Sequence, residues 1–357
     1  MSAADVRPRF VLAANQGELG GGEVMLLATA QVLQRFGLDV SVIAPARPAL
    51  VVEAAAARGL PTIPLPGATR RGYLAALARW RLRHPAVPLW CHGLAPALAT
   101  AGIGPRLVHL HQLPRRWHRR AAALASWRAA RVLVPSHHVA ARVPGAEVLE
   151  NWTAEVPFAP SRRAPGTPFT VGFLGRLTRD KGVDVLARAM AHVAAEHEVR
   201  LLLAGETRFG RPDEAAALEA ALRDVEGITE RPGWMARDAF FAAVDLAVFP
   251  SSAPESFGLV AAEAMAAGVP FVISDAGALP EVAGPDHPWV ARHGEAEDLA
   301  RVLARALEEL RQGDEQRAHR ARERWQREYS PQAGEARVAR MLSGLAAPAH
   351  GERRGDR

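Results

Sequence analysis

The sequence predicts an α/β protein made of two doubly wound domains with a cleft between them. Its length is the first reason, because 357 residues exceed what one hydrophobic core usually supports and correspond to about two domains of about 150 residues. The second reason is that strand-like apolar runs alternate with helical patterns along almost the whole chain, which is typical of parallel sheets. The third reason is a break at residues 154–168, a proline-rich stretch without periodicity that we interpret as a linker.

The N-terminal half opens on the strand-like run RFVLAA at 9–14, which leads through a GELGGGE loop at 17–23 into a helix over 23–36. Similar apolar runs follow at intervals, as expected for the strands of one sheet. These further strands are expected at 39–44, 87–91, 106–110, 131–135 and 147–150.

The alternation resumes after the linker with the strand FTVGFLG at 169–175. Further strands are expected at 199–205, 245–250 and 269–274, and helices at 183–195, 213–224, 258–267 and about 332–345. We therefore assign residues 1–155 to an N-terminal domain and 165–326 to a C-terminal domain. The stretch at about 327–345 is expected to pack back on the first domain, and the tail at 346–357 to be disordered.

Composition excludes several classes of protein. Apolar residues make up 49% and charged residues 23% of the chain, as in ordinary globular proteins, and the longest apolar runs fall short of the ~20 residues that cross a bilayer. The first residues do not show a basic segment followed by an apolar one, so no secretory signal is expected. The single cysteine, Cys91, excludes an internal disulfide. These features favour the cytoplasm.

The net charge of +6 is divided unevenly, with +10 on residues 1–155 and −4 on the remainder. The positive charge concentrates in RRGYLAALARWRLRH (70–84) and RRWHRR (115–120), which also contain tryptophan. Such a surface suits an anionic membrane, an acidic ligand or, in principle, nucleic acid, and the alternative is a solvated helix face. Because the chain has neither an RNP-like aromatic strand nor a zinc-finger spacing, no nucleic-acid partner is expected. Our hypothesis is a peripheral position at the inner face of the plasma membrane.

The segment GRLTRDKG at 175–182 contains Lys181, the only lysine beside 43 arginines. It runs from the end of a strand to the start of a helix, where open α/β sheets bind their ligands. The helix N-terminus favours an anion, and Arg176 and Lys181 add two full charges. A compact ammonium kept against such a bias toward arginine indicates a phosphate site.

A second motif, PESFGLVAAEAMAAGVP at 254–270, places Glu263 in a helix that is apolar nearly all round. A buried carboxylate is costly without partners, so a polar group should meet it, and a ribose diol would do so. Glu255 lies in the loop before this helix and can reach another part of the same ligand. The alternative for either residue is a solvated glutamate. Gly268 is expected to end the helix as a C-cap.

Other motifs narrow the chemistry. The loop SDAGALPE at 274–281 follows a strand and has small residues that let backbone N–H groups approach an anion. The GELGGGE loop fits neither the dinucleotide nor the P-loop glycine spacing, and the chain has no Asp-x-Asp pair, HExxH or Cys–His cluster. His109 and His111 lie at a strand end, where an imidazole can face a ligand, and we expect one of the two to face the core.

These segments together resemble the retaining glycosyltransferases of family four, whose GT-B fold consists of two facing Rossmann-like domains. The resemblance rests on GRLTRDKGVDVL, on PSSAPESFGLVAAEAMAAGVPFVISDAGALPEV (250–282), on GGGEVMLLATAQVL (20–33) and on HLHQ (109–112), and it extends from about residue 9 to about 345. It implies a nucleoside diphosphate sugar held mainly by the C-terminal domain and an acceptor held mainly by the N-terminal one. The acceptor is expected to be a glycan, a lipid-linked molecule or a small molecule.

The resemblance also implies roles for individual residues. Arg176 and Lys181 would bind the donor diphosphate, Glu263 the ribose and Glu255 the sugar. His111 would lie beside the reacting sugar. The remaining candidates for donor binding are Gly21, Gly22, Gly175, Ser256, Phe257, Gly258 and Leu259. Family members need no essential metal, which agrees with the missing Asp-x-Asp pair.

Two departures from the family pattern matter. Gly277–Ala278 replaces a common pair of glycines and is expected to add a methyl group close to the donor. Asn151–Trp152 replaces a frequent Asn-Gly pair, which predicts a stiffer hinge between the domains.

The expected reaction is the transfer of a hexose-like sugar to an acceptor hydroxyl with retention at the anomeric carbon. Because no carboxylate is an obvious nucleophile, we favour front-face substitution, in which the departing phosphate helps to deprotonate the acceptor. A sugar-nucleotide epimerase of the same fold, or a basic nucleic-acid-binding protein, are the alternatives.

Overall fold

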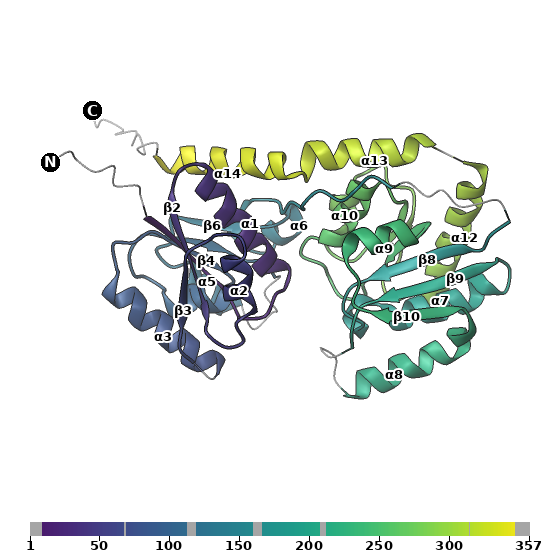
Figure 1. Cartoon of the computed structure of the whole chain (residues 1–357), viewed down its shortest axis with the longest axis horizontal. Helices are drawn as coiled ribbons and strands as arrows, with labels where there is room; N and C mark the ends of the chain where they lie inside the picture. Colours follow the sequence, from purple (N-terminus) through teal and green to yellow (C-terminus); the bar gives the residue numbers. More distant parts are fainter. Residues whose placement is uncertain are drawn as a thin grey trace, which may run out of the picture.

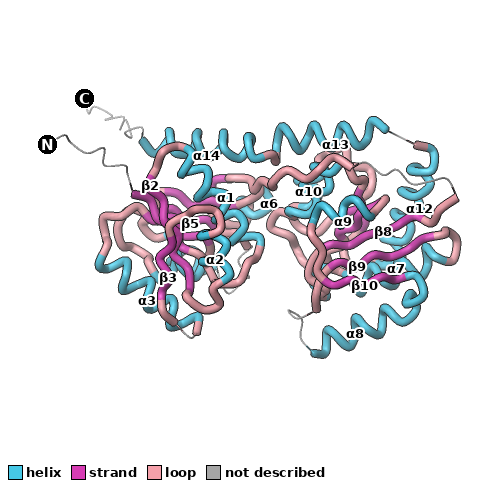
Figure 2. Tube along the Cα trace, viewed as in Figure 1, coloured by secondary structure: helices cyan, strands magenta, loops and turns pink. Residues whose placement is uncertain are grey.

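The computed structural model describes residues 9–67, 69–112, 119–159, 166–207, 212–313 and 315–346. Two parallel sheets, each flanked by helices, form two lobes that lie side by side along the long axis (Figure 1). Figure 2 shows the strands of each lobe enclosed by helices. The α/β class and the two doubly wound units predicted from the sequence are therefore confirmed.

The N-terminal lobe contains a seven-stranded sheet in the order β3-β2-β1-β4-β5-β6-β7. Every strand pair in it is parallel. Between strands, a helix or loop carries the chain back to the end of the sheet where the previous strand began. Its strands are β1 (Arg9–Ala13), β2 (Asp39–Pro45), β3 (Thr62–Leu65), β4 (Leu89–His92), β5 (Arg106–His109), β6 (Arg131–Val134) and β7 (Glu147–Val148). Its helices are α1 (Gly21–Arg35), α2 (Leu50–Ala56), α3 (Arg70–Arg83), α4 (Leu94–Ala99), α5 (Arg119–Ser126) and α6 (His137–Ala140).

The C-terminal lobe contains a six-stranded parallel sheet in the order β10-β9-β8-β11-β12-β13. Its strands are β8 (Phe169–Leu174), β9 (Val199–Ala204), β10 (Thr229–Gly233), β11 (Leu246–Phe249), β12 (Phe271–Ser274) and β13 (Val290–Ala291). Its helices are α7 (Val183–Ala194), α8 (Pro212–Leu222), α9 (Arg237–Ala243), α10 (Leu259–Ala267), α11 (Leu279–Ala283) and α12 (Ala296–Gln312).

Each sheet has a hydrophobic core on both faces, because alternate residues of a strand point to opposite sides. In β1, Leu12 packs in the core beneath α1, whereas Val11 and Ala13 pack in the core on the other face. In β8, Val171 and Leu174 divide in the same way between the two cores of the C-terminal lobe. Strands buried on both faces are what a parallel sheet requires.

The two last helices, α13 (Glu315–Glu328) and α14 (Pro331–Ala346), run along both lobes (Figure 1). Trp325 of α13 belongs to a core of the C-terminal lobe, and Val338 of α14 belongs to the N-terminal core beneath α1. The crossing chain near Thr153 is bound to them, since the Trp325 indole donates to Thr153 Oγ1 at 2.8 Å and the Thr153 N–H donates to the Tyr329 carbonyl at 3.0 Å. The end of the chain thus fastens the connection between the lobes.

Two arginines of the basic N-terminal half are buried, which corrects part of the charged-surface interpretation. Arg81 of α3 is 0% exposed, and Arg106 of β5 is 1% exposed. Arg81 donates to the carbonyls of Ile103, His84, Val87 and Pro105. Arg106 likewise donates to backbone carbonyls of neighbouring segments. A guanidinium offers five donors in a fixed geometry, so these two side chains hold loops together and are not available to a partner.

Residues 160–165 of the expected linker at 154–168, residues 347–357 of the tail at 346–357 and residues 115–118 of the basic segment RRWHRR lie outside the described residues. Among the described helices, none combines the length and the apolar composition needed to cross a membrane.

Candidate active site

The loop between β8 and α7 places Lys181 at the carboxyl edge of the C-terminal sheet. A 3-10 turn over Arg179–Lys181 ends at Gly182, whose φ is +71°. A Cβ on Gly182 would lie 1.9 Å from the Pro250 carbonyl oxygen, so only glycine lets this loop pack on the segment after β11. The backbone N–H groups of Ser252 and Ala253 donate to the Asp180 carbonyl and fix the two loops together.

This packing brings Lys181 to Glu255. The Lys181 ammonium lies 2.5 Å from Glu255 Oε1, and the Ser251 hydroxyl donates to the same oxygen at 2.6 Å. Burial by itself would raise the pKa of Glu255, but Lys181, Ser251 and the nearby Arg176 outweigh it and hold the pKa below its usual value. Glu255 is therefore an ionised carboxylate. The exposed Arg176 adds a second cation to this edge.

Glu263 is buried in α10 and has found a partner within the protein. Its side chain is 9% exposed, and Arg237 of α9 lies 2.7 Å from Glu263 Oε1. Burial raises the pKa of Glu263 despite the opposing effect of Arg237. The expected polar group is thus the Arg237 guanidinium in this structure, which the sequence analysis did not identify.

The segment before α10 joins the two lobes. Ser256 accepts a hydrogen bond from the Ser136 hydroxyl of the N-terminal lobe at 2.8 Å, through its carbonyl oxygen. Gly258 caps α10 with a φ of +104°, and a Cβ there would lie 2.5 Å from Leu279 Cδ2. Phe257 is buried and packs edge-on against Tyr329, so its side chain supports the loop and does not face a ligand. At the other end of α10, Gly268 forms the expected C-cap, with a φ of +71°.

The glycines at the start of α1 lie between the two lobes. A Cβ on Gly21 would lie 3.2 Å from Leu259 Cδ1 of α10, and a Cβ on Gly22 would lie 3.2 Å from His111 Cδ2. The structure therefore brings Gly21, Gly22, His111 and Leu259 together, as one group. Gly175, at the end of β8, has a φ of +153° and lies next to Arg176 in the neighbouring loop.

His111 is one of three histidines packed together; of the His109–His111 pair, His109 is buried in the core, as expected for one of the two, and His111 is partly buried. Residues two apart in an extended chain point to the same side, and the two ring centroids are 4.0 Å apart. His92 at the end of β4 joins them, with its Nδ1 2.9 Å from His111 Nε2. Burial lowers the pKa of all three, that of His111 to about 3, so each is a neutral imidazole.

Glu23, in the first turn of α1, is a buried acid that the sequence analysis did not single out. It is 4% exposed, and its carboxylate accepts a hydrogen bond from the Gly20 N–H at 3.2 Å. Burial raises its pKa to about 7 in spite of this bond. The sequence contains a signal for this role. Glu23 lies three residues after the N-cap residue Gly20, which is the spacing of a capping box.

The loop at 274–281 contacts Glu255 through its backbone. Glu255 and Gly277 form a parallel bridge, and the Ala278 N–H donates to the Glu255 carbonyl at 2.9 Å. Ala278 is 0% exposed. Its methyl group is therefore packed inside the protein, and its closeness to the donor stays a prediction.

Glu281 at the end of this loop makes a contact between the lobes that the sequence does not reveal. Its carboxylate accepts hydrogen bonds from the His137 and His138 N–H groups, at 2.8 and 2.9 Å. These N–H groups belong to the first turn of α6. A residue of the C-terminal lobe therefore supplies hydrogen-bond acceptors for a helix of the N-terminal lobe.

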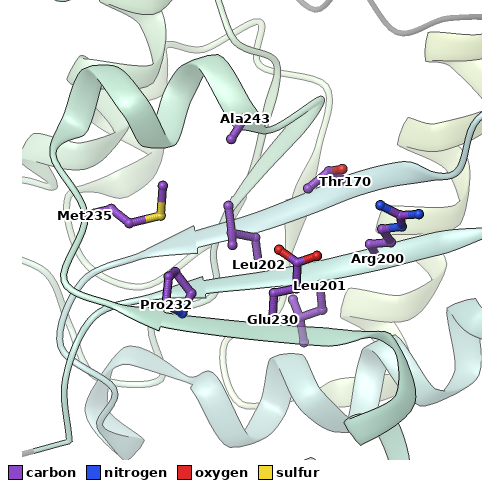
Figure 3. Close-up of a pocket in the computed structure, with 8 residues that line it drawn as sticks. All are labelled: Thr170, Arg200, Leu201, Leu202, Glu230, Pro232, Met235 and Ala243. Atoms are coloured by element: carbon purple, nitrogen blue, oxygen red, sulfur yellow. The ribbon is translucent and has the colours of Figure 1, made fainter.

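A hollow of about 300 Å³ lies elsewhere in the C-terminal lobe (Figure 3). It is lined by residues of β8, β9, β10, α9 and the loop between β10 and α9, among them Thr170, Arg200, Glu230 and Met235. It shares no residue with the site around Lys181 and Glu255.

Comparison with known proteins agrees with this geometry. Residues 168–309 match the family of glycosyl transferases group 1. The chain is 35% identical over 134 residues to an MMP alpha-(1->4)-mannosyltransferase of Mycolicibacterium hassiacum, covering 37% of this chain and 32% of that protein. It is 37% identical over 171 residues to a D-inositol 3-phosphate glycosyltransferase of Segniliparus rotundus, covering 44% and 37%. The chain thus matches about a third of the length of these relatives.

Solved structures match over nearly the whole chain. Anabaena Alr3699/HepE in complex with UDP-glucose superposes with a TM-score of 0.77 at 20% identity, covering 94% of this chain and 100% of that one. Sucrose-phosphate synthase (tll1590) from Thermosynechococcus elongatus gives 0.79 at 19% identity, covering 96% and 100%. The protein therefore has the GT-B fold expected from the sequence, and residues 168–309 of its C-terminal lobe are similar to group 1 glycosyltransferases.

Proposed function

We propose that this protein is a retaining glycosyltransferase that moves a hexose-like sugar from a nucleoside diphosphate sugar to an acceptor hydroxyl. The observation that carries the proposal is the cluster of Arg176, Lys181 and Glu255 at the carboxyl edge of the C-terminal sheet, within the segment that matches group 1 glycosyltransferases. Ligands of open parallel sheets bind at this edge.

The diphosphate of the donor binds Lys181 and Arg176. Arg176 is exposed and Lys181 is 26% exposed at its side chain, so both cations are accessible to an anion. In the structure Glu255 holds the ammonium in place. When the donor enters, phosphate oxygens become the partners of Lys181, and the Glu255 carboxylate can then accept hydrogen bonds from sugar hydroxyls.

Glu263 binds the ribose of the donor. Its carboxylate already accepts from Arg237, and a ribose diol adds further hydrogen-bond donors to it. Arg237 is 41% exposed at its side chain and can move aside without being removed from water. The proposal for ribose therefore rests on a buried acid whose partner, Arg237, is itself partly exposed.

Transfer proceeds on the front face of the sugar. Lys181 and Arg176 stabilise the negative charge that develops on the leaving diphosphate. In other enzymes a metal ion has this role. The leaving phosphate oxygen takes the proton of the acceptor hydroxyl as the new glycosidic bond forms. His111 is a neutral imidazole whose Nδ1 has no hydrogen-bond partner among the described residues, and we place it beside the reacting sugar. No essential metal takes part.

The acceptor binds the N-terminal lobe and is a glycan, a lipid-linked molecule or another component of the cell envelope. This lobe carries the net charge of +10. Its α3 helix presents Arg71, Arg79 and Arg83 to solvent, together with Leu82, which is 64% exposed. Basic side chains around an apolar one suit an anionic membrane surface, where such an acceptor would be found. We therefore propose peripheral association at the inner face of the plasma membrane.

The test is to incubate the protein with UDP-glucose and with other nucleoside diphosphate hexoses, and to follow the first sugar released by proton NMR. The structure of Alr3699/HepE in complex with UDP-glucose makes this donor the first choice. The proposal predicts release of the nucleoside diphosphate with retained anomeric configuration, in buffer containing a chelator. Inversion, or conversion of the donor into an isomeric sugar nucleotide without release, would contradict it, and the second result would indicate an epimerase.

A further inference from the structure

Three histidines gather on one face of the N-terminal sheet. His92 and His109 are register partners in the adjacent parallel strands β4 and β5, and His111 follows two residues after His109. Their side chains therefore leave the sheet on the same side. One ring nitrogen from each lies within 4.8 Å of the corresponding nitrogens of the other two. The strands β4 and β5 hold His92 and His109, and His111 lies in the segment directly after β5.

Most of the ring nitrogens in this cluster have no hydrogen-bond partner. His92 Nδ1 and His111 Nε2 share the contact at 2.9 Å. His92 Nε2, both nitrogens of His109 and His111 Nδ1 are buried and without a partner among the described residues. A buried polar atom left without a hydrogen bond is destabilising, so four such atoms at one place point to a bound group that satisfies some of them.

We propose that His92, His109 and His111 bind a divalent transition-metal ion, and that Zn²⁺ is the ion the site suits best. Three imidazoles are a common ligand set for zinc, which takes a fourth ligand such as water. With Zn–N distances of about 2.0–2.1 Å, two ligand nitrogens in a tetrahedron lie ~3.4 Å apart. The observed separations, from 2.9 Å to the limit of 4.8 Å, lie on both sides of this value, so small ring rotations close the site.

The surroundings favour an ion over a purely structural histidine stack. Trp90 packs against the rings of His92 and His109, with centroids 5.5 and 6.3 Å away, and supplies a dry apolar wall. His111 is the one member that is only partly buried, so an ion enters from its side. His92 and His109 are thus the buried ligands, and His111 is the ligand nearest the surface.

The metal would affect the proposed transfer because it occupies a ring nitrogen of His111. If His111 acts beside the donor sugar, as proposed above, bound Zn²⁺ removes it from that role and inhibits the enzyme. This consequence rests on the proposed function, whereas metal binding itself does not. The ion is thus a regulator of the site and takes no part as a cofactor in the reaction.

The test is a titration of the untagged full chain, freed of metal with a chelator, with Co²⁺ in the absence of donor and acceptor. Four-coordinate Co²⁺ gives an intense visible absorption, and Zn²⁺ should displace it. His92→Gln and His111→Gln each remove one ligand, and His192→Ala changes an exposed histidine on α7 as the matched control. Because loss of a residue that merely orients a ligand weakens metal binding by about 10–100-fold, loss of a ligand should weaken it by at least about 100-fold.

The expected result is one Co²⁺ per chain, with binding lost in the two glutamine variants and kept in His192→Ala. Circular dichroism reports whether His92→Gln folds, and the partly exposed His111→Gln decides the question if it does not. Absence of the visible band in the wild type, or equal binding by His111→Gln, would overturn the proposal. The readout is independent of activity, so a protein that is inactive in chelator but binds Co²⁺ once the chelator is removed would refute the proposed function and leave the metal site standing.

Discussion

Lys181 shows how a single residue can be predicted from composition and then given a place by the structure. In a chain with 43 arginines, its ammonium lies 2.5 Å from Glu255, inside a loop that Gly182 holds close to the Pro250 carbonyl. Composition predicts a role for the residue, because a bias toward arginine leaves lysine where a point charge is needed. Its pairing with Glu255 could not be predicted, since 74 residues separate the two in sequence.

Lys181→Ala should lower kcat by about 10²–10³, as removal of one electrostatic stabiliser of the transition state typically does. Lys181→Arg should also be impaired, because a planar guanidinium does not replace a point charge in this loop. Arg179→Ala, at an exposed position on the same turn, is the matched control and should behave like the wild type. Steady-state kinetics on the purified variants measure these effects, and unchanged kinetics in Lys181→Ala would make this lysine a surface charge.

Glu263→Gln should raise the KM for the donor more than Glu255→Gln does. The amide keeps the shape of Glu263 but weakens the charge-assisted hydrogen bonds that we propose for the ribose. A donor with a 2′,3′-dideoxyribose tests the same contact from the side of the ligand. It should bind the wild type more weakly than the normal donor does. Equal affinity for the two donors would show that Glu263 does not bind the ribose.

At the scale of elements, the strands that the sequence analysis missed are β3, β10 and β13, and all three lie at an edge of their sheet. An edge strand is covered on fewer sides, so its apolar pattern is weak. β3 reads TIPL and β10 reads TERPG, each with a proline, and β13 has only two residues. The inner strands, buried on both faces, were all predicted within a few residues of their bounds.

The helices α12 and α13 were missed, and in α12 the signal is present. In α12, Leu299, Leu303 and Leu307 recur at helical spacing on the buried face and pack in the C-terminal core. In the candidate site, by contrast, some contacts could not have been predicted from any local pattern. The meeting of His111 with Gly22, or of Glu263 with Arg237, depends on how separate elements pack and has no local signature in the sequence.

Glu23 makes the stability of the N-terminal lobe depend on pH. Burial raises its pKa from 4.5 to about 7 in the folded state, so the protonated form is favoured there. Its stabilising contribution is complete below about pH 4.5 and is lost as the pH rises to about 7, by about 3 kcal/mol. Glu23→Gln keeps the shape of the side chain but should lack this dependence. Urea unfolding of both proteins between these pH values measures the difference, and parallel pH profiles would contradict it.

At the scale of the whole molecule, α13 and α14 tie the lobes together, and Trp152 is part of this contact. Trp152 is 4% exposed and packs in the N-terminal core, where a Cβ on Gly334 of α14 would lie 2.2 Å from its ring. The bulky Trp152 thus lies where the chain passes between the lobes and packs against α14. The contacts of Glu281 with α6 and of Leu259 with Gly21 join the lobes again beside the proposed site.

The basic N-terminal lobe should bind anionic vesicles through α3. Neutralising Arg71, Arg79 and Arg83 together should remove about 1 kcal/mol of binding per residue that reaches the surface. Arg188, Arg301 and Arg305 of the C-terminal lobe, changed together, provide a control with the same loss of charge. Co-sedimentation with anionic and with zwitterionic vesicles measures the effect. Binding that ignores lipid charge, or equal losses in the two triple variants, would leave α3 as a solvated helix.

The central claim, that a nucleoside diphosphate sugar binds at Lys181 and Glu263, is tested most directly by thermal unfolding with UDP-, GDP- and ADP-sugars. A ligand at 100 times its Kd stabilises a protein by about 2.7 kcal/mol, so the matching donor should raise the Tm of the wild type measurably. Lys181→Ala and Glu263→Gln should each reduce that rise, while Arg179→Ala should retain it. If no sugar nucleotide raises the Tm, or if the rise is the same in all four proteins, the donor does not bind where the structure places these charges.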